Sequence, residues 1–191
     1  MSLINSGISD RKAWRLRLLN CRLQECDRLS TVALRPTQPP SFIGVPRIEK
    51  SSLNLLTSER GIDYTRLLNL LKLGKWKEAD QQTFTVMFKA AGREKEGCLD
   101  YTSIENFPCI DLRTIDQLWV EYSNGRFGFT VKKSIWERVG KDYECFGNAI
   151  GWRQEKKNVE WLNYNELTLN TSAPIGHLAA AIAPPIGVNG V

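Results

Sequence analysis

"RFGFTVKKSIW", residues 126–136, is the stretch that decides the fold class, because it fits either a strand or a helix. It follows Asn124-Gly125, a pair favoured in two-residue hairpin turns, and the alternation of its phenylalanines and valine is typical of a half-buried strand. A strand at this place would predict a small β-domain. A helix would predict an all-α protein.

The sequences on both sides favour the helix. Upstream, "LRTIDQLWVEY" (residues 112–122) carries apolar side chains at helical spacing, so a helix runs to its end. Asn124-Gly125 then fits a left-handed helix C-cap better than a hairpin turn. Downstream, apolar residues repeat every four positions from Val131 to Val139, a spacing that a strand does not keep. We therefore predict a helix over 127–139, in which Gly128 would cost about 1 kcal/mol.

The remainder of the domain also has helical periodicity. Residues 64–91 carry two apolar stripes, and Gly74 and Gly92 end them, which predicts an antiparallel helical pair. The segment after Gly151 is irregular and rich in aromatic residues. The predicted fold class is all-α, in a compact domain. Three further helices begin at candidate N-caps, namely Thr102 (in a capping box with Glu105), Asp111 and Asp142.

The composition changes along the chain and predicts four parts. Residues 1–50 hold nine Lys and Arg against four Asp and Glu, whereas the rest of the chain holds seventeen of each. Four prolines in residues 35–47 indicate a linker. The predicted parts are a basic and possibly helical extension (1–33), a Pro-rich linker (34–54), a helical domain (55–178) and an apolar, flexible tail (179–191).

The basic extension has two interpretations. Its possible amphipathic helix, residues 11–29, would suit a membrane-surface arm, a nucleic-acid-binding arm or a targeting sequence. It would equally suit an accessory helix docked on the domain, or a poorly ordered extension. We favour the second interpretation, because Glu25 and Asp27 interrupt the positive charge and acidic residues are scarce in transit peptides.

Cysteine usage and hydropathy exclude several classes of protein. The five cysteines are odd in number, none has CxxC spacing, and the single histidine, His177, lies far from all of them. We therefore expect reduced thiols in a cytosol-like compartment, rather than a disulfide framework or a zinc site. No run of the sequence approaches the roughly 18 apolar residues that a membrane span needs.

Catalytic motifs are missing, which favours a binding protein over an enzyme. The sequence has no phosphate-binding loop, and one histidine cannot be combined with other groups into a credible triad or metal-activated water. Residues 93–101 and 152–164 instead place aromatic rings beside cations, a combination suited to a flat, apolar ligand with acidic groups. Two sets of residues are expected to be structural: the carboxylates Asp111, Asp116 and Glu121 at cap or solvent positions, and Trp76, Trp119, Phe127 and Phe129 in the core.

Four long motifs carry a resemblance to a known family. They are "KWKEADQQT" (75–83), "IENFPCIDLRTIDQLWVEYSNGRFGFTVKKSIW" (104–136), "GKDYECFGNAIGWR" (140–153) and "SAPIGHL" (172–178). In this order they resemble the genomes-uncoupled-four family of tetrapyrrole-binding regulators of magnesium chelatase, over roughly residues 61–178. The resemblance implies an all-helical domain shaped like a cupped hand.

The resemblance also implies a function. Its members bind protoporphyrin IX and magnesium protoporphyrin IX non-covalently and stimulate the chelatase of chlorophyll biosynthesis by engaging its large porphyrin-binding subunit. This chain would then be a non-catalytic activator in a cyanobacterial cytoplasm or a plastid stroma, with peripheral membrane association as an open option. Nucleic acid is not an expected partner.

The family's porphyrin site maps onto two segments of this chain. One segment is the loop after the second domain helix, represented by Arg93, Leu99 and Tyr101, and the other follows "GW" and is represented by Arg153, Trp161 and Tyr164. No metal ligand is implied, and the place of His177 inside "APIGHL" favours a structural role over axial ligation of a chelated metal.

The chain departs from the family pattern after His177. Porphyrin-binding members carry arginines there that face the propionates, whereas this chain continues "AAAIAPPIGVNGV" and has no cation after Lys157. Lys156 and Lys157 could replace them, although such a pair is more often a solvated loop. The alternative function is therefore a divergent paralogue that acts as a protein-interaction module, with weak or no porphyrin binding.

Overall fold

The computed structural model describes residues 22–26, 28, 56–155 and 159–180. These residues are mostly helical, with one short hairpin, so the predicted all-α class is confirmed. The elements in chain order are α3 (Thr65–Lys72), α4 (Trp76–Ala91), α5 (Tyr101–Glu105), α6 (Cys109–Tyr122), α7 (Phe129–Arg138), α8 (Tyr143–Ala149), β1 (Arg153–Glu155), β2 (Val159–Trp161) and a 3₁₀ turn, η1 (Tyr164–Glu166).

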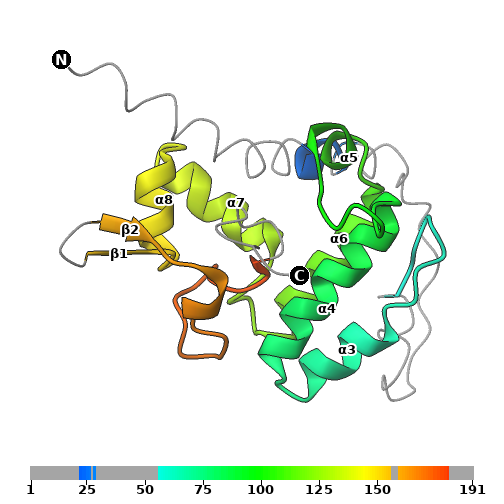
Figure 1. Cartoon of the computed structure of the whole chain (residues 1–191), viewed down its shortest axis with the longest axis horizontal. Coiled ribbons are helices and arrows are strands. Elements are labelled where there is room, and N and C mark those ends of the chain that lie inside the picture. Colours follow the sequence, from blue (N-terminus) through cyan, green and yellow to red (C-terminus); the bar gives the residue numbers. More distant parts are fainter. Residues whose placement is uncertain (1–21, 27, 29–55, 156–158, 181–191) are drawn as a thin grey trace, which may run out of the picture.

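The helices form a series of packed neighbours. Helix α3 packs against α4 and α6, α6 packs against α7, and α7 packs against α8. Figure 1 shows α3, α4 and α6 on one side, α5 near one end of them, and α8 with the hairpin on the opposite side. Strands β1 and β2 are antiparallel, with Arg153 opposite Trp161, so the segment predicted to be irregular begins as a hairpin.

The junction between α6 and α7 confirms that "SNG" is a helix cap. Asn124 and Gly125 both have positive φ, 52° and 74°, directly after the end of α6. The N–H of Gly125 donates to the carbonyl of Val120 at 2.8 Å, which closes the last turn of the helix. The predicted helix follows, but it begins at Phe129 instead of residue 127.

Gly128 lies before α7 and not inside it, so its predicted cost to the helix is wrong. With φ at 138° it occupies the N-cap position, a conformation that residues with a Cβ rarely adopt. The cap itself comes from the preceding helix, because Oδ1 of Asp116 accepts from the N–H groups of Phe129 at 2.6 Å and Thr130 at 3.0 Å. Asp116 is therefore buried, not a solvent or cap residue of its own helix.

The other three predicted caps have mixed outcomes. Asp142 caps α8 as predicted, accepting from the N–H of Cys145 at 2.7 Å. The Thr102 capping box is wrong, because Asp100 caps α5 through the N–H of Ser103. Asp111 is not a cap either, since α6 begins before it at Cys109.

Asp111 is instead fully buried and holds the segment before α3 onto α6. Its carboxylate accepts from the Tyr64 hydroxyl at 2.7 Å and from the backbone N–H of Glu59 at 3.0 Å, and also from the Ser58 hydroxyl. A buried carboxylate needs such donors to replace water. This one connects residues about 50 positions apart in the chain.

An aromatic cluster lies where α4, α6 and the start of α7 meet. Trp119 and Phe127 are fully buried, with ring centroids 6.4 Å apart, and the partly buried Trp76 contacts both. The indole N–H of Trp119 donates to the Thr83 hydroxyl at 2.9 Å. Phe129 is fully buried as well, so the rings predicted to be structural belong to the core.

The described part of the basic extension is a helix docked on the domain. This docked helix comprises residues 22–26 and 28, and it buries Leu23 and Cys26. Arg22 Nε donates to the carbonyl of Phe107 at 2.8 Å. In Figure 1 the docked helix lies beside the segment that joins α5 to α6.

A disulfide between Cys26 and Cys109 corrects the prediction of reduced thiols. Their Cα atoms are 5.2 Å apart, although the two residues are separated by 83 positions. The spacing of cysteines along the sequence could not reveal this pair, because only the docking of the helix brings the sulfurs together. Cys98 and Cys145 are free and exposed. Cys21 lies outside the described residues.

The carboxyl-terminal end of the described chain is buried. Ala179 and Ala180, the first two residues of the predicted tail, have no exposed surface. The rest of that tail, residues 181–191, and the predicted linker, residues 34–54, lie outside the described residues.

Substituting Gly128 tests the α6–α7 junction. A Cβ at this position would lie 2.8 Å from both Asp116 Oδ1 and Val120 Cγ2. We expect Gly128→Ala to lower the free energy of unfolding by about 3 kcal/mol, through backbone strain and overpacking together. Urea denaturation followed by circular dichroism measures this loss.

Gly140→Ala is the matched control. It also has positive φ, 71°, but nothing lies within 4 Å of its Cβ, so only the backbone cost of about 1 kcal/mol applies. Equal losses in the two variants would show that the junction moves aside for a methyl group.

Candidate functional site

The first predicted segment is the loop between α4 and α5, called here the first wall and represented by Arg93, Leu99 and Tyr101. Arg93 follows the left-handed C-cap Gly92, and its guanidinium lies 3.1 Å from Asp100 Oδ2. Leu99 is buried, whereas Tyr101 is 55% exposed as the first residue of α5. Of the three, Tyr101 presents the largest apolar surface to a partner.

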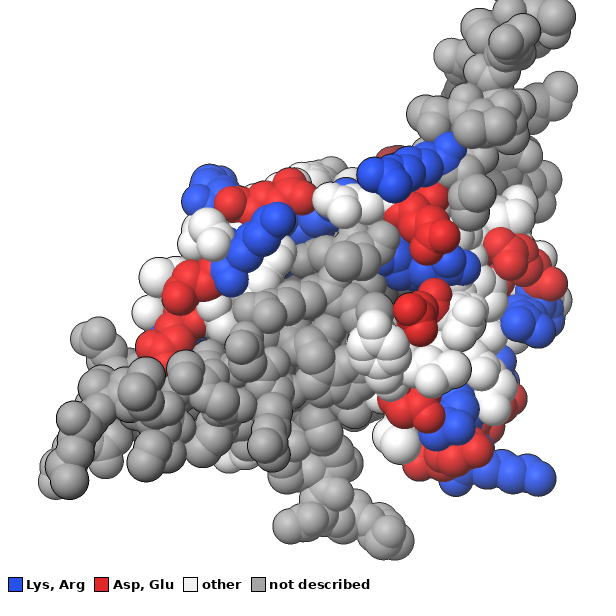
Figure 2. Space-filling model, turned by 90° about the horizontal axis from the view of Figure 1, so that it is seen from above, with Lys and Arg blue, Asp and Glu red and all other residues white. Residues whose placement is uncertain are grey.

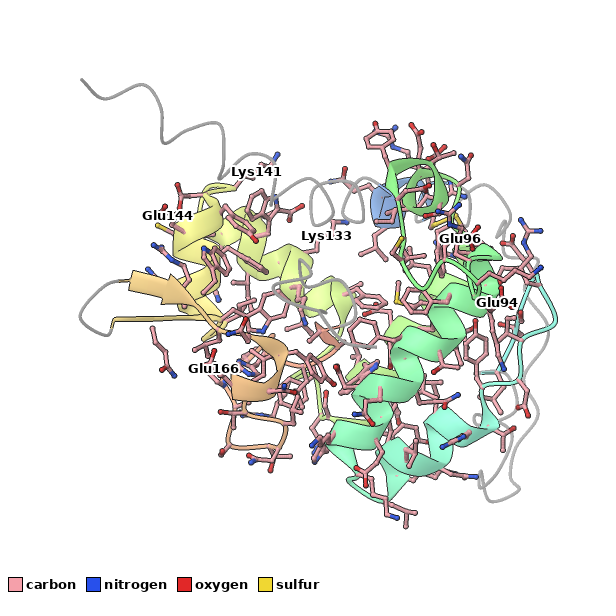
Figure 3. The ribbon with its side chains drawn as sticks, viewed as in Figure 1. Glu94, Glu96, Lys133, Lys141, Glu144 and Glu166 are labelled. Atoms are coloured by element: carbon pink, nitrogen blue, oxygen red, sulfur yellow. A yellow bond between two sulfur atoms is a disulfide. The ribbon has the colours of Figure 1, made fainter. Side chains whose placement is uncertain are left out.

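A small pocket of about 280 Å³ lies at this wall. Arg93 and Asp100 line it together with residues from the end of α4 and from α5. Its lining combines charged, hydroxyl and amide groups with apolar alanine and proline side chains. Figure 3 shows Glu94 and Glu96 of the same loop on the side of the molecule away from the hairpin.

The second predicted segment is the hairpin, called here the second wall and represented by Arg153 and Trp161. The Trp161 ring stacks on Tyr143 of α8 with centroids 4.3 Å apart, and the Arg153 guanidinium lies 5.7 Å from the Trp161 centroid. Arg153 Nη2 also pairs with Glu144 at 3.2 Å. Figure 3 shows Glu144 and Lys141 at α8, on the opposite side from Glu94.

Gly147 makes the position of Trp161 possible. A Cβ on Gly147 would lie 2.5 Å from the Trp161 ring and 2.9 Å from the side chain of Arg153. The indole therefore lies directly on the backbone of α8. A glycine inside a helix is costly, and the close contact with Trp161 is the physical reason for it here.

Tyr164 lies in neither wall: it is the first residue of η1 and packs against α4. Its hydroxyl donates to Asp80 Oδ2 at 2.9 Å, and its ring meets Phe84 edge to face with centroids 5.9 Å apart. The six predicted site residues thus fall into three groups: Arg93, Leu99 and Tyr101 in the first wall, Arg153 and Trp161 in the second wall, and Tyr164 on η1, packed against α4.

Sequence reasoning missed a buried charge cluster, which consists of Asp80 on α4, Asp116 on α6 and Lys132 on α7. Asp80 and Lys132 have no exposed surface, and Asp116 is 5% exposed. Lys132 Nζ donates to the carbonyl of Leu178 and lies 5.3 Å from the Trp152 ring centroid. Asp80 Oδ1 accepts from the N–H of Ala180 at 2.7 Å.

Burial controls the titration of this cluster. Burial raises the pKa of Asp80, against the opposing effect of hydrogen bonds from Ala180 and Tyr164. It lowers the pKa of Lys132 to about 7, although the charges of Asp80 and Asp116 act in the other direction. Loss of water around each group therefore outweighs the attraction between them.

His177 is held by the backbone through both ring nitrogens. Nδ1 lies 2.7 Å from the carbonyl of Ile150, and Nε2 accepts from the N–H of Thr168 at 3.1 Å. This arrangement places the proton on Nδ1, and burial lowers the pKa of the ring. Neither nitrogen is open to a metal in this conformation, which agrees with a structural role.

Two features are absent from the described residues and bear on other functions. No group of three His, Cys, Asp or Glu side chains there is arranged to hold a metal ion. Among the same residues, no helix combines the length and apolar character that a bilayer span demands. On the face shown in Figure 2, the described basic and acidic side chains are interspersed, in contrast to the basic stripe typical of nucleic-acid-binding proteins.

Comparison with known proteins places the domain in a family. A family model described as GUN4-like matches residues 57–183. The chain belongs to the GUN4-like family. The predicted resemblance is therefore confirmed.

Relatives of this GUN4-like chain include a Ycf53-like protein of Synechocystis sp., 36% identical over 125 residues. Another is the tetrapyrrole-binding protein, chloroplastic, of Arabidopsis thaliana, 30% identical over 122 residues. These alignments cover 64% and 59% of this chain, and 53% and 46% of the relatives. The GUN4-like chain thus spans about half the length of the curated relatives it matches.

Solved structures agree with this family. The structure of GUN4 from Chlamydomonas reinhardtii matches with a TM-score of 0.58 at 32% identity, covering 67% of this chain and 91% of that one. The ligand-free structure of Arabidopsis thaliana GUN4 matches with a TM-score of 0.55 at 26% identity, covering 68% and 97%. The helical architecture of the GUN4-like domain is therefore shared with both.

The buried lysine predicts how stability depends on pH. Because the pKa of Lys132 is about 7 in the folded state and 10.5 without burial, the unfolded chain binds more protons between these values. The free energy of unfolding should therefore rise with pH over this interval, by at most about 1.4 kcal/mol per pH unit. Urea denaturation at pH 7, 8 and 9 measures the slope.

Two variants test whether Lys132 causes this rise of the free energy of unfolding with pH. Lys132→Met should be less stable, because it leaves Asp80 without its cation, and should lose the rise with pH. Lys133→Met, one residue along the same helix, should keep the wild-type slope. A wild-type slope of zero, or a slope retained in Lys132→Met, would contradict the electrostatics described above.

Proposed function

We propose that this chain binds a tetrapyrrole, protoporphyrin IX or magnesium protoporphyrin IX, between the first wall and the second wall. The observation that carries the proposal is family membership over residues 57–183, together with a relative in Arabidopsis thaliana that is named as tetrapyrrole-binding. Tyr101 and Trp161 would contact the faces of the macrocycle. The ligand would be non-covalent, and no residue of this chain would serve as a metal ligand.

Buried polar atoms support a ligand with acidic groups. Nε of Arg93 in the first wall and Nε of Arg153 in the second wall are both buried without a hydrogen-bond partner, as are the Tyr143 hydroxyl and Nε of Arg126, which belongs to neither wall. Unsatisfied buried donors are rare in folded proteins and are satisfied by an acceptor such as a carboxylate. The residues at both walls therefore fit the propionate groups of a porphyrin.

The ring faces would supply most of the affinity. Micromolar binding requires about 8 kcal/mol, and a buried apolar side chain contributes roughly 1.5–3 kcal/mol, whereas an exposed ion pair contributes about 0–1 kcal/mol. Loss of two peripheral arginines after His177 would weaken binding by about tenfold, at about 1.4 kcal/mol per tenfold change. Lys156 and Lys157, which could replace them, lie outside the described residues.

The biological role that we infer is activation of magnesium chelatase in chlorophyll biosynthesis. The partner would be the large porphyrin-binding subunit of that enzyme, and this chain would deliver or present the porphyrin without catalysing a reaction. Cyanobacterial and chloroplastic relatives support a cyanobacterial cytoplasm or a plastid stroma as the location.

A second candidate function is protein interaction without porphyrin. It is favoured by the internal contacts of two predicted site residues, since Trp161 stacks on Tyr143 and Tyr164 donates to Asp80. In this conformation neither ring is wholly available to a ligand. A divergent family member could keep the helical scaffold and bind the chelatase subunit alone.

Porphyrin titration tests the first candidate. We expect Tyr101→Ala and Trp161→Ala each to weaken binding of a water-soluble porphyrin by about 10- to 100-fold, because each removes roughly 1.5–3 kcal/mol of apolar contact. The porphyrin's own absorbance is the readout, so that removing a tryptophan does not change the signal. Leu73→Ala, at a 70% exposed leucine between α3 and α4, is the control and should bind as the wild type does.

The outcomes separate the two candidates. No spectral change with wild-type chain up to high micromolar porphyrin would exclude the porphyrin site. Binding that neither substitution weakens would show that the ligand lies elsewhere on the domain. Capture of the large chelatase subunit by wild-type chain in the absence of porphyrin, combined with no porphyrin binding, would establish the second candidate.

A further inference from the structure

The Cys26–Cys109 disulfide joins the docked helix to the start of α6. Among the described residues of the docked helix, Leu23 is 2% exposed, whereas Gln24, Glu25 and Arg28 are exposed. Two hydrogen bonds add to this contact, from Arg22 to the Phe107 carbonyl and from Arg113 to the Cys26 carbonyl. The disulfide and these contacts hold the described residues of the docked helix on the domain.

The two cysteines of the disulfide are buried, unlike the other described cysteines. Cys98 and Cys145 are free and exposed, whereas Cys109 is 9% exposed and Cys26 is 1% exposed. Cys109 is the first residue of α6, and the amino-terminal end of a helix stabilises a thiolate. Residue Cys109 is thus the more exposed of the pair, so an attacking thiolate would bond to its sulfur and expel Cys26 as a thiolate. The end of α6 then stabilises Cys109 when the mixed disulfide is resolved and Cys109 leaves as a thiolate.

We propose that Cys26 and Cys109 form a redox modification site that controls the docking of the amino-terminal helix. Its reductant is a protein dithiol, whose thiolate attacks one sulfur of the bond to form a mixed disulfide. The second thiol of the reductant then resolves that intermediate. Cys26 and Cys109 gain two electrons and two protons and become thiols, while the reductant becomes a disulfide.

In the compartment proposed above, this disulfide can be reduced and re-formed, which makes it suited to regulation. Disulfides in a cytoplasm or stroma meet dithiol reductants and are commonly transient. This setting rests on the function proposed above, but the bond and its contacts do not. Reduction removes the covalent link and leaves non-covalent contacts, among them buried Leu23 and the hydrogen bonds of Arg22 and Arg113, so the docked helix leaves the surface where α5 joins α6 more readily.

Hydrogen exchange on the full chain tests the proposal. The chain is equilibrated in buffers with increasing ratios of reduced to oxidised dithiothreitol, and differential alkylation with peptide mapping reports each cysteine. Cys26 and Cys109 should become alkylated together at one common ratio. Amide exchange in the peptide that contains residues 22–28 should quicken at least tenfold at the same ratio, while exchange in residues 112–119 of α6 stays unchanged.

Matched variants separate the switch from general unfolding. The double variant Cys98→Ser/Cys145→Ser should still show the quickening of amide exchange in residues 22–28 on reduction. Cys21→Ser should show it as well. Cys26→Ser should show fast exchange in residues 22–28 at every ratio, with α6 still protected. A small protein dithiol such as a thioredoxin should drive the same change at micromolar concentration.

Three results would overturn the proposal. One is peptide mapping that finds Cys26 and Cys109 as free thiols in the fully oxidised sample. Another is a disulfide that pairs Cys109 with Cys21. The last is exchange in residues 22–28 that does not respond to reduction. None of these measurements uses porphyrin, so the outcome is independent of whether the chain binds a tetrapyrrole.

Discussion

One buried lysine constrains most of the described structure. Lys132 has no exposed surface, and the carboxylates of Asp80 and Asp116 provide the negative charge around it. An unpaired charge in a protein interior costs several kcal/mol, so α4, α6 and α7 must pack in the arrangement that keeps these groups close. Residue types that usually lie on the surface therefore determine how three helices meet.

The same charges position the carboxyl-terminal part of the domain. The Leu178 carbonyl accepts from Lys132, and the Ala180 N–H donates to Asp80, which draws this segment between α4 and α7. Close approach also requires Gly176, where a Cβ would lie 2.6 Å from Ile135. Polar contacts with backbone groups thus explain why a run of alanines is buried, although alanines alone provide little apolar area.

Periodicity was sufficient to predict the helices, and failed where contacts join distant residues. The stripes of α4 and α6 and the Asn124-Gly125 cap depend on neighbours a few positions away, so the sequence predicts them correctly. Asp80 lies four residues after Trp76, and Lys132 three after Phe129, both on apolar faces of their helices. That position was the available signal, but their charge favoured the surface until the partners on other helices were known.

The disulfide and the candidate site illustrate the same limit. Cys26 and Cys109 are 83 positions apart, and no local pattern relates them. Aromatic rings beside cations were enough to select the two walls. Their internal partners were not predictable, because the stacking of Trp161 depends on Gly147 in α8 and the hydrogen bond of Tyr164 depends on Asp80 in α4.

These internal partners restrict how a ligand can bind. A ligand that displaced Tyr164 would remove one of the donors to the Asp80 carboxylate and so increase the cost of burying that charge beside Lys132. A ligand that contacts the Tyr164 ring in place carries no such cost. Trp161 is restricted in the same way, because Tyr143 stacks on its ring and the Arg153 guanidinium lies 5.7 Å from the ring centroid. The buried charge cluster therefore favours a mode of binding that covers existing aromatic surfaces without reorganising them.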